Sequence, residues 1–530
     1  MTSMSLKKKA CRQPAIDEHR DGHAQAAAVP STVGPLAMGG VRHLPRLRLR
    51  PRLALTCLAV ATLSGCLSLE PRYTQPQAPI PASFPVVAPA DTDSASQDLA
   101  WRTYFTDPLL QTLIQSALDN NRDLRKATLR VEEARAAFRI QRSDRVPTAT
   151  LGVQGARSRV PGDLNASGAS IVAGEYRGEV GLNSWELDLW GRVHSLETSA
   201  LETWLATDAA RQAVQVALVS QVAEGYLGLR ELDERVLIAR KSVSAREASY
   251  RIFQRRYELG ATSKLEVMQV KTLLTQSQTL HAQLAQQRAQ QVNALQLLIG
   301  GNPGILPDEA PFDDNAILAP LAPGLPSDLL VQRPDIIAAE HRLRASHANI
   351  GAARAAFFPR IALTGSYGSA SAELDGLFDS GSRAWAFMPT ISLPIFDGGR
   401  RRAGLALSEV RRDIAVADYE QSVQIAFRDV ADALAARHWT TEQSDIARTA
   451  RDAQAERARL AQLRYDNGSS AYLEVLDAQR DLLEAEQHLI STRRAQLSSQ
   501  IALYSALGGG TEPADHAMTG PDAADTRPIP

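Results

Sequence analysis

Apolar residues recur with helical spacing along most of the chain, in long stretches that contain no proline. The longest stretch runs from Val193 to Ile299. Within it, apolar or small residues alternate at steps of four and three: Leu218, Val222, Gly225, Leu229, Leu232, Val236, Ala239 and Val243. This heptad pattern predicts a helix that packs lengthwise against its neighbours. A helix from Val193 to Leu259 would be about 100 Å long, more than a compact domain needs.

Other segments predict a further helix and four strands. The helix is expected to start at Asp107-Pro108, because proline suits the first helical turn, and to end before Pro147. Strands are expected where apolar and polar residues alternate, in residues 149–153, 176–189, 360–367 and 385–395. Residues 161–174, with glycine and serine, predict a loop. A second proline-free stretch, residues 395–512, carries an apolar residue at every seventh position: Leu476, Leu483, Ile490 and Leu497.

The chain repeats its own plan. Residues 256–267 (RYELGATSKLEV) correspond to residues 464–475 (RYDNGSSAYLEV), 208 positions later. In both, a glycine follows a long helix, as in a left-handed C-terminal cap, and small hydroxyl residues after it can cap a returning helix. Each motif therefore predicts the tip of a helical hairpin, and the pair predicts an internal duplication.

The N-terminus has the pattern of an export signal. Five arginines between positions 42 and 52 precede the apolar run LALTCLAVATL at 53–63. The run ends in Leu63-Ser64-Gly65-Cys66, which looks like a lipobox and predicts cleavage before Cys66 and attachment of lipid to it. Leu67, in place of an aspartate, favours sorting to the outer membrane. Met38 would be a more ordinary start than Met1.

These patterns divide the chain into six parts. We expect a signal peptide at 1–65, a lipid-anchored tether at 66–100, a first repeat at 101–303 with its tip near 260, an equatorial linker at 304–325, a second repeat at 326–511 with its tip near 468, and a disordered tail at 512–530. The tether is rich in proline, which favours an extended chain.

Charge and motifs exclude several functions. The net charge is −1, but residues 66–530 alone carry −8, which argues against a nucleic-acid partner. Cys11 and Cys57 would leave with the signal, so neither a disulfide within the mature chain nor a cysteine metal site is expected. No HExxH, Walker or GxGxxG motif occurs. The sequence therefore predicts a protein that is not an enzyme, with no catalytic residues, no metal and no cofactor apart from the lipid on Cys66.

Four strands pose a problem if they enter a membrane. The smallest closed barrels need about eight strands, and an open edge in lipid leaves backbone groups unpaired. Several copies would therefore share one barrel. The alternative is an ordinary soluble sheet, but the export signal and the long helices favour the shared barrel.

Specific stretches carry a family resemblance that covers nearly all of residues 66–510. They are W-R-x-x-F-x-D-P-x-L-x-x-L-I from Trp101, GLPSDLLVQRPDI at 324–336, IGAARAAFFPRIALTGSYG at 350–368 and FDGGR at 396–400. In these stretches the chain resembles the outer-membrane factor (TolC-like) family, most closely the lipoprotein NodT/OprM-type branch of resistance-nodulation-division efflux systems. The resemblance implies a mainly α fold with membrane β structure. Three chains would form a periplasmic α-barrel of twelve helices and a shared, trimeric 12-stranded β-barrel.

The resemblance also implies a function and partners. The homotrimer would be the outer-membrane channel of a tripartite efflux system, a passive exit duct anchored by lipid and extending into the periplasm. It would bind a periplasmic adaptor protein attached to an inner-membrane pump. The alternative is a periplasmic coiled-coil adaptor or scaffold lipoprotein. Adaptors have one helical hairpin and several domains of short strands, so two hairpins and four strands favour the channel.

By the same resemblance, site residues fall at the two tips. The adaptor-facing residues would be Leu259, Gly260, Ser263, Leu265, Asn467, Gly468, Ser469 and Ser470. An iris-like gate would follow in the second tip, with Leu473 as an apolar ring, Asp477 as an anionic ring and Glu474 in place of an aspartate used by some members. The competing interpretation of Asp477 is an exposed helix position paired with Arg480.

Overall fold

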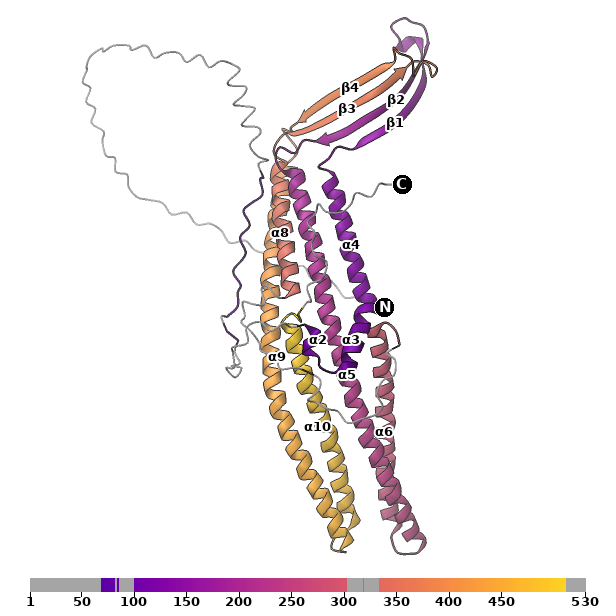
Figure 1. The fold of residues 1–530 in the computed structure, drawn as a ribbon, viewed down its shortest axis with the longest axis vertical. Helices are drawn as coiled ribbons and strands as arrows, with labels where there is room; N and C mark the ends of the chain where they lie inside the picture. The colour runs from indigo at the N-terminus through magenta and orange to yellow at the C-terminus, as the bar shows by residue number, and fades with distance from the viewer. Residues whose placement is uncertain (1–67, 82, 85–99, 303–317, 319–332, 511–530) are drawn as a thin grey trace, which may run out of the picture. The chain divides into compact units, whose positions relative to one another are not determined.

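The computed structural model describes residues 68–81, 83, 84, 100–302, 318 and 333–510. Figure 1 shows long helices in side-by-side pairs and one four-stranded sheet. The predicted signal peptide, Cys66 and the predicted tail lie outside the described residues, as does the predicted linker apart from Leu318. In the described part of the chain, no helix is both long and apolar enough to cross a membrane.

Both halves contain a helix, two strands, a long helix and a shorter helix in the same order, and the first half has two further helices and a 3-10 turn among the described residues. The first half has α2 (Trp101–Tyr104), α3 (Pro108–Asn120), α4 (Arg122–Ser143), β1 (Ala149–Val160), the 3-10 turn η1 (Gly162–Leu164), β2 (Ile171–Glu186), α5 (Arg192–Glu258) and α6 (Lys264–Ile299). The second half has α8 (Pro334–Ala355), β3 (Arg360–Ser371), β4 (Arg383–Ser392), α9 (Arg400–Asp466) and α10 (Tyr472–Ala506).

The long helix predicted from the heptad pattern is confirmed. Helices α5 and α9 each have 67 residues, or about 100 Å. The heptad positions Leu218, Val222, Leu229, Val236 and Ala239 are buried. Because α5 follows β2 directly and ends at the first tip, the sheet and that tip lie at opposite ends of one helix.

The helix predicted between Pro108 and Pro147 is in fact two helices. Asn121 caps both helices. Its backbone amide makes the last hydrogen bond of α3, and its side-chain oxygen accepts hydrogen bonds from the amides of Asp123 and Leu124, at 2.8 and 2.9 Å, in the first turn of α4. Its extended backbone (ψ 131°) breaks the helix. Strand β2 also begins earlier than predicted, at Ile171, so the loop before it is shorter.

The proline-rich segment does not act as a free tether over its described part. Tyr73 donates a hydrogen bond to Glu340 of α8 at 3.1 Å, and Phe84 stacks on Phe427 of α9 with ring centroids 5.1 Å apart. Apolar and aromatic residues between the prolines supply this docking, which the proline content alone did not reveal.

The main core joins the two halves of the chain. Tyr104, which ends α2, stacks on Tyr504 of α10 at 4.8 Å, and Phe105 meets the same ring edge-on at 5.3 Å. The Tyr104 hydroxyl donates to the carbonyl of Gln500 at 2.9 Å. All three rings are at most 4% exposed, so the start of the first repeat is fixed to the end of the second.

Candidate functional site

The two hairpin tips have the same backbone turn. Gly260 has φ +69° and Gly468 has φ +70°. The amide of each glycine donates to the carbonyl three residues earlier at 2.9 Å. The next amide donates to the carbonyl five residues earlier, at 2.8 Å in the first tip and 2.9 Å in the second. This is the Schellman motif, which requires a left-handed residue after the helix. The predicted glycine caps are confirmed at both tips.

The two tips differ where the second helix starts. In the first, Ser263 and Glu266 form a capping box, with hydrogen bonds of 3.2 and 3.0 Å between side chain and backbone in each direction. In the second, Ala471 takes the cap position and no side chain caps the helix. The prediction of a hydroxyl cap is therefore wrong for the second tip. Glu474, the counterpart of Glu266, instead pairs with Arg464 across the hairpin.

Aromatic residues hold the two hairpins together close to their tips. Phe253 of α5 packs on Tyr472 of α10 with ring centroids 4.5 Å apart, and the Tyr472 hydroxyl donates to Ser249 at 2.7 Å. The Arg256 guanidinium donates to the Tyr465 hydroxyl. These contacts are few, so the tips are less firmly joined than the core around Tyr504.

The predicted gate residues lie on the first two turns of α10. Leu473 and Asp477 are four residues apart and so share one face of the helix. The Leu473 residue is 48% exposed and the Asp477 side chain 45% exposed. Asp477 pairs with Arg480 at 3.3 Å, as the competing interpretation requires. Both partners are about half exposed, so this pair holds Asp477 only weakly.

The remaining tip residues are exposed leucines and turn residues. Leu259 and Leu265 are 69% and 68% exposed, and they leave an apolar surface uncovered at the first tip. Asn467 ends α9, and its side chain donates to the Leu463 carbonyl at 2.8 Å. The Ser469 hydroxyl donates to the Arg464 carbonyl at 2.9 Å, whereas the Ser470 hydroxyl is buried and has no partner within the described residues.

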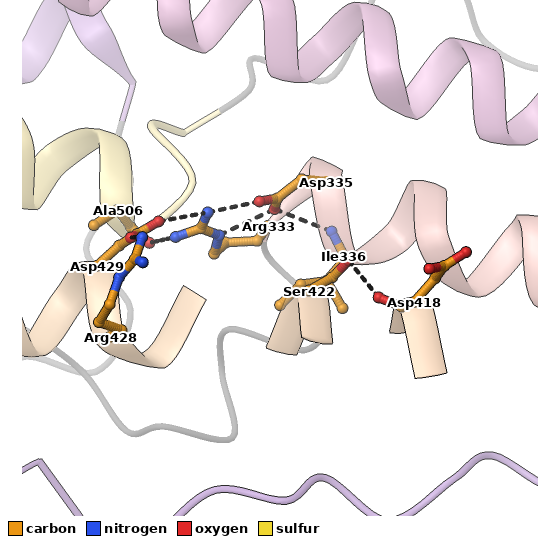
Figure 2. Close-up of polar contacts among 8 residues, drawn as sticks. All are labelled: Arg333, Asp335, Ile336, Asp418, Ser422, Arg428, Asp429 and Ala506. Carbon is orange, nitrogen blue, oxygen red and sulfur yellow. Dashed lines mark hydrogen bonds and ion pairs between the residues drawn. The ribbon is translucent and has the colours of Figure 1, made fainter. Parts of the chain in front are cut away.

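A buried arginine that our sequence reasoning did not single out ties three helices together (Figure 2). Arg333, just before α8, donates to Asp335 at 2.6 and 3.0 Å and to the Ala506 carbonyl at the end of α10 at 2.9 Å. It also pairs at 3.4 Å with Asp429 of α9, which Arg428 contacts at 2.8 Å. The sequence motif QRPDI could have indicated this network, because its arginine and aspartate flank the proline that starts α8.

The antiparallel sheet, in the order β1-β2-β3-β4, has one apolar face. Leu151, Val180, Tyr367 and Trp385 are paired in register across all four strands, so their side chains form one row on the same face. Their exposed fractions range from 54% to 81%. The neighbouring row on the opposite face contains small or polar residues: Thr150, Gly181, Ser366 and Ala386.

Paired long hairpins with matching tips, joined to a sheet with an exposed apolar face, define the class of channel-forming export proteins. The sequence profile described as outer membrane efflux protein matches residues 113–301 and 325–509. The chain belongs to the outer membrane efflux protein family. This membership rules out the alternative of a periplasmic adaptor or scaffold.

Individual relatives match over almost their whole length. The toluene efflux pump outer membrane protein TtgF of Pseudomonas putida is 46% identical over 464 residues, which cover 86% of this chain and 95% of that protein. The outer membrane protein OprJ of Pseudomonas aeruginosa is 42% identical over 463 residues, covering 87% and 96%. The open state of the Neisseria gonorrhoeae MtrE outer membrane channel has a TM-score of 0.75 at 37% identity, covering 84% and 98%.

Proposed function

We propose that three copies of this chain form an outer-membrane exit duct through which a tripartite efflux system releases small molecules. The channel function rests on the family and on relatives named as outer membrane proteins of efflux pumps. The inner-membrane pump and the periplasmic adaptor would select the substrate, and the duct would conduct it passively.

The observation that carries the proposal is the exposed apolar face of the sheet. Side chains such as Leu151 and Trp385, 81% and 75% exposed, are unfavourable in water but favourable against lipid. Strands β1 and β4 lie at the two edges of the sheet in the described chain, and unpaired edges are costly in lipid. Copies joined edge to edge would satisfy both requirements, with the small and polar row lining the interior.

The tips and the N-terminus would supply docking, gating and anchoring. The exposed leucines Leu259 and Leu265 would contact the adaptor. In a trimer, three copies of Leu473 and Asp477 would narrow the tunnel, because facing carboxylates repel one another and attract cations. A lipid on Cys66 would hold the chain at the outer membrane.

A pair of matched variants tests the membrane orientation of the sheet. Tyr367→Arg puts a charge on the apolar face, which costs about 2–4 kcal/mol near the bilayer midplane. Ser366→Arg puts the same charge on the neighbouring position of the opposite face. We expect Tyr367→Arg alone to reduce the yield of heat-resistant trimer in lipid vesicles. Equal yields, or a wild-type protein that stays monomeric and outside the bilayer, would refute the proposal.

A further inference from the structure

A cavity of about 300 Å3 lies between the two hairpins of the chain, among α5, α6 and α10. Three arginines and three leucines contribute to its wall: Arg235, Arg246, Arg480, Leu273, Leu280 and Leu483. The cavity is therefore both cationic and apolar. Its volume is at the lower end of the range of cavities that bind small molecules, about 300–1,000 Å3.

Arg246 is a buried cation without an acidic partner in the described chain. The residue is 4% exposed. Its Nε donates to the Ser242 hydroxyl at 3.2 Å, but its Nη1 has no acceptor within the described residues. Burial lowers the pKa of Arg246; the nearby Tyr472 hydroxyl partly offsets this effect, and repulsion by Arg480 adds to it. Arginine keeps its charge in proteins, so the charge remains and is uncompensated.

The other charged groups in the wall do not compensate Arg246. Arg235 pairs with Glu231 at 3.0 Å and donates to Gln487 at 2.6 Å. Arg480 pairs with Asp477 and Asp481. Glu484 is the one carboxylate in the described wall, and its residue is exposed to solvent. A carboxylate supplied from outside would give Arg246 its missing acceptor.

We propose that this cavity binds a small organic carboxylate, with its charged group on Arg246 and its apolar body against Leu273, Leu280 and Leu483. A planar guanidinium and a carboxylate match in geometry and form strong, charge-assisted hydrogen bonds. The leucines favour an anion with a compact apolar body over a fully hydrated inorganic ion.

The site also has a consequence for the gate, and this part rests on the proposed function. Arg480 lies in the cavity wall and pairs with Asp477 at 3.3 Å. A bound carboxylate would compete with Asp477 for this guanidinium. The ligand would thereby change the charge environment of Asp477, the proposed anionic ring of the constriction.

Isothermal titration calorimetry on the detergent-solubilised full-length protein tests the site. We expect saturable binding of benzoate and none of benzyl alcohol, which keeps the ring but lacks the charge. Arg246→Gln should weaken benzoate binding about tenfold or more, as expected for loss of a charge-assisted hydrogen bond. Arg251→Gln removes an exposed arginine of the same helix outside the cavity wall and should bind as the wild type does.

A crystallographic measurement covers the case in which Arg246→Gln does not fold. Wild-type crystals soaked in 4-bromobenzoate should show an anomalous bromine peak inside the cavity. The proposal is overturned if benzoate does not bind, if Arg246→Gln binds it unchanged, or if a chloride ion, a water or a carboxylate of a neighbouring chain occupies Arg246 in the soaked crystal. None of these outcomes affects the vesicle test of the sheet, so the two proposals fail separately.

Discussion

Replacing Gly468 by alanine should loosen the second hairpin tip while leaving the rest of α9 intact. Gly468 has φ +70°, and a Cβ built on it would meet no other heavy atom within 4 Å. The cost therefore comes from the left-handed backbone alone, about 1–2 kcal/mol for a residue with a side chain. That free energy corresponds to about a 5- to 30-fold change in an equilibrium constant.

Hydrogen exchange at the tip measures this change directly. The amides of residues 468 and 469 donate to the carbonyls of Tyr465 and Arg464, so they exchange when the turn opens. In Gly468→Ala we expect both to exchange about 5- to 30-fold faster than in the wild type, if opening remains a local event.

Gly404→Ala is the matched control. Gly404 lies in the helical part of α9, also with open space around an added Cβ. Alanine is favoured over glycine inside a helix by about 0.5–1 kcal/mol, so this change should slow exchange near residue 404 and leave the tip unaltered. Equal exchange at the tip in Gly468→Ala and Gly404→Ala would refute the reasoning from the left-handed backbone.

Three further predictions concern the gate, the centre and the N-terminal segment. Leu473→Ser combined with Asp477→Ser should raise single-channel conductance in planar bilayers and sensitivity of cells to large antibiotics; unchanged values would exclude this constriction. Arg333→Met should destabilise the protein by about 1–3 kcal/mol, because the buried Ala506 carbonyl loses its hydrogen-bond donor while Asp335 and Asp429 remain partly exposed to water, and lower its melting temperature, whereas Arg428→Gln, an exposed control, should change it little. Burial raises the pKa of Glu70, so docking of its segment is strongest below the ordinary carboxyl pKa of 4.5 and weakens as pH rises from there through the raised value. Glu70→Gln should therefore slow proteolysis within residues 68–81 at pH 7 but not at pH 4; slowing at both would contradict this.

The long helices and the tip turns were predictable because their signals are strong and local. A heptad pattern maintained from Leu218 to Val243 admits few other structures, and a glycine that ends a helix specifies its own backbone conformation. The break at Asn121 was missed because one side chain makes it, through two hydrogen bonds to nearby amides. Those bonds leave the apolar periodicity of the flanking helices unchanged.

The partners of the site residues were much less predictable than their positions. Glu266 and Glu474 occupy equivalent places in the repeat, yet one caps its own helix and the other reaches Arg464. The difference arises because the cap position is Ser263 in the first tip and Ala471 in the second. The overall similarity of the two motifs conceals this change. Arg333 is a second example, because two of its acceptors lie 96 and 173 positions away along the chain. Contacts at such separations depend on how the helices pack, which periodicity does not specify.

Each hairpin is firmly attached near the centre of the chain and only loosely attached at its tip, so it can tilt about its attached end. The Arg333 network and the Tyr104–Tyr504 stack fix the central part of the chain, whereas the tips have only a few side-chain contacts. Helix α6 has 36 residues, a rigid arm of about 54 Å. A tilt of about 10° at the fixed end would displace its tip by about 9 Å on that length. A partner that binds at the tips would therefore act where few contacts join the two hairpins, among them Phe253 on Tyr472 and Arg256 on Tyr465, while the central contacts stay in place.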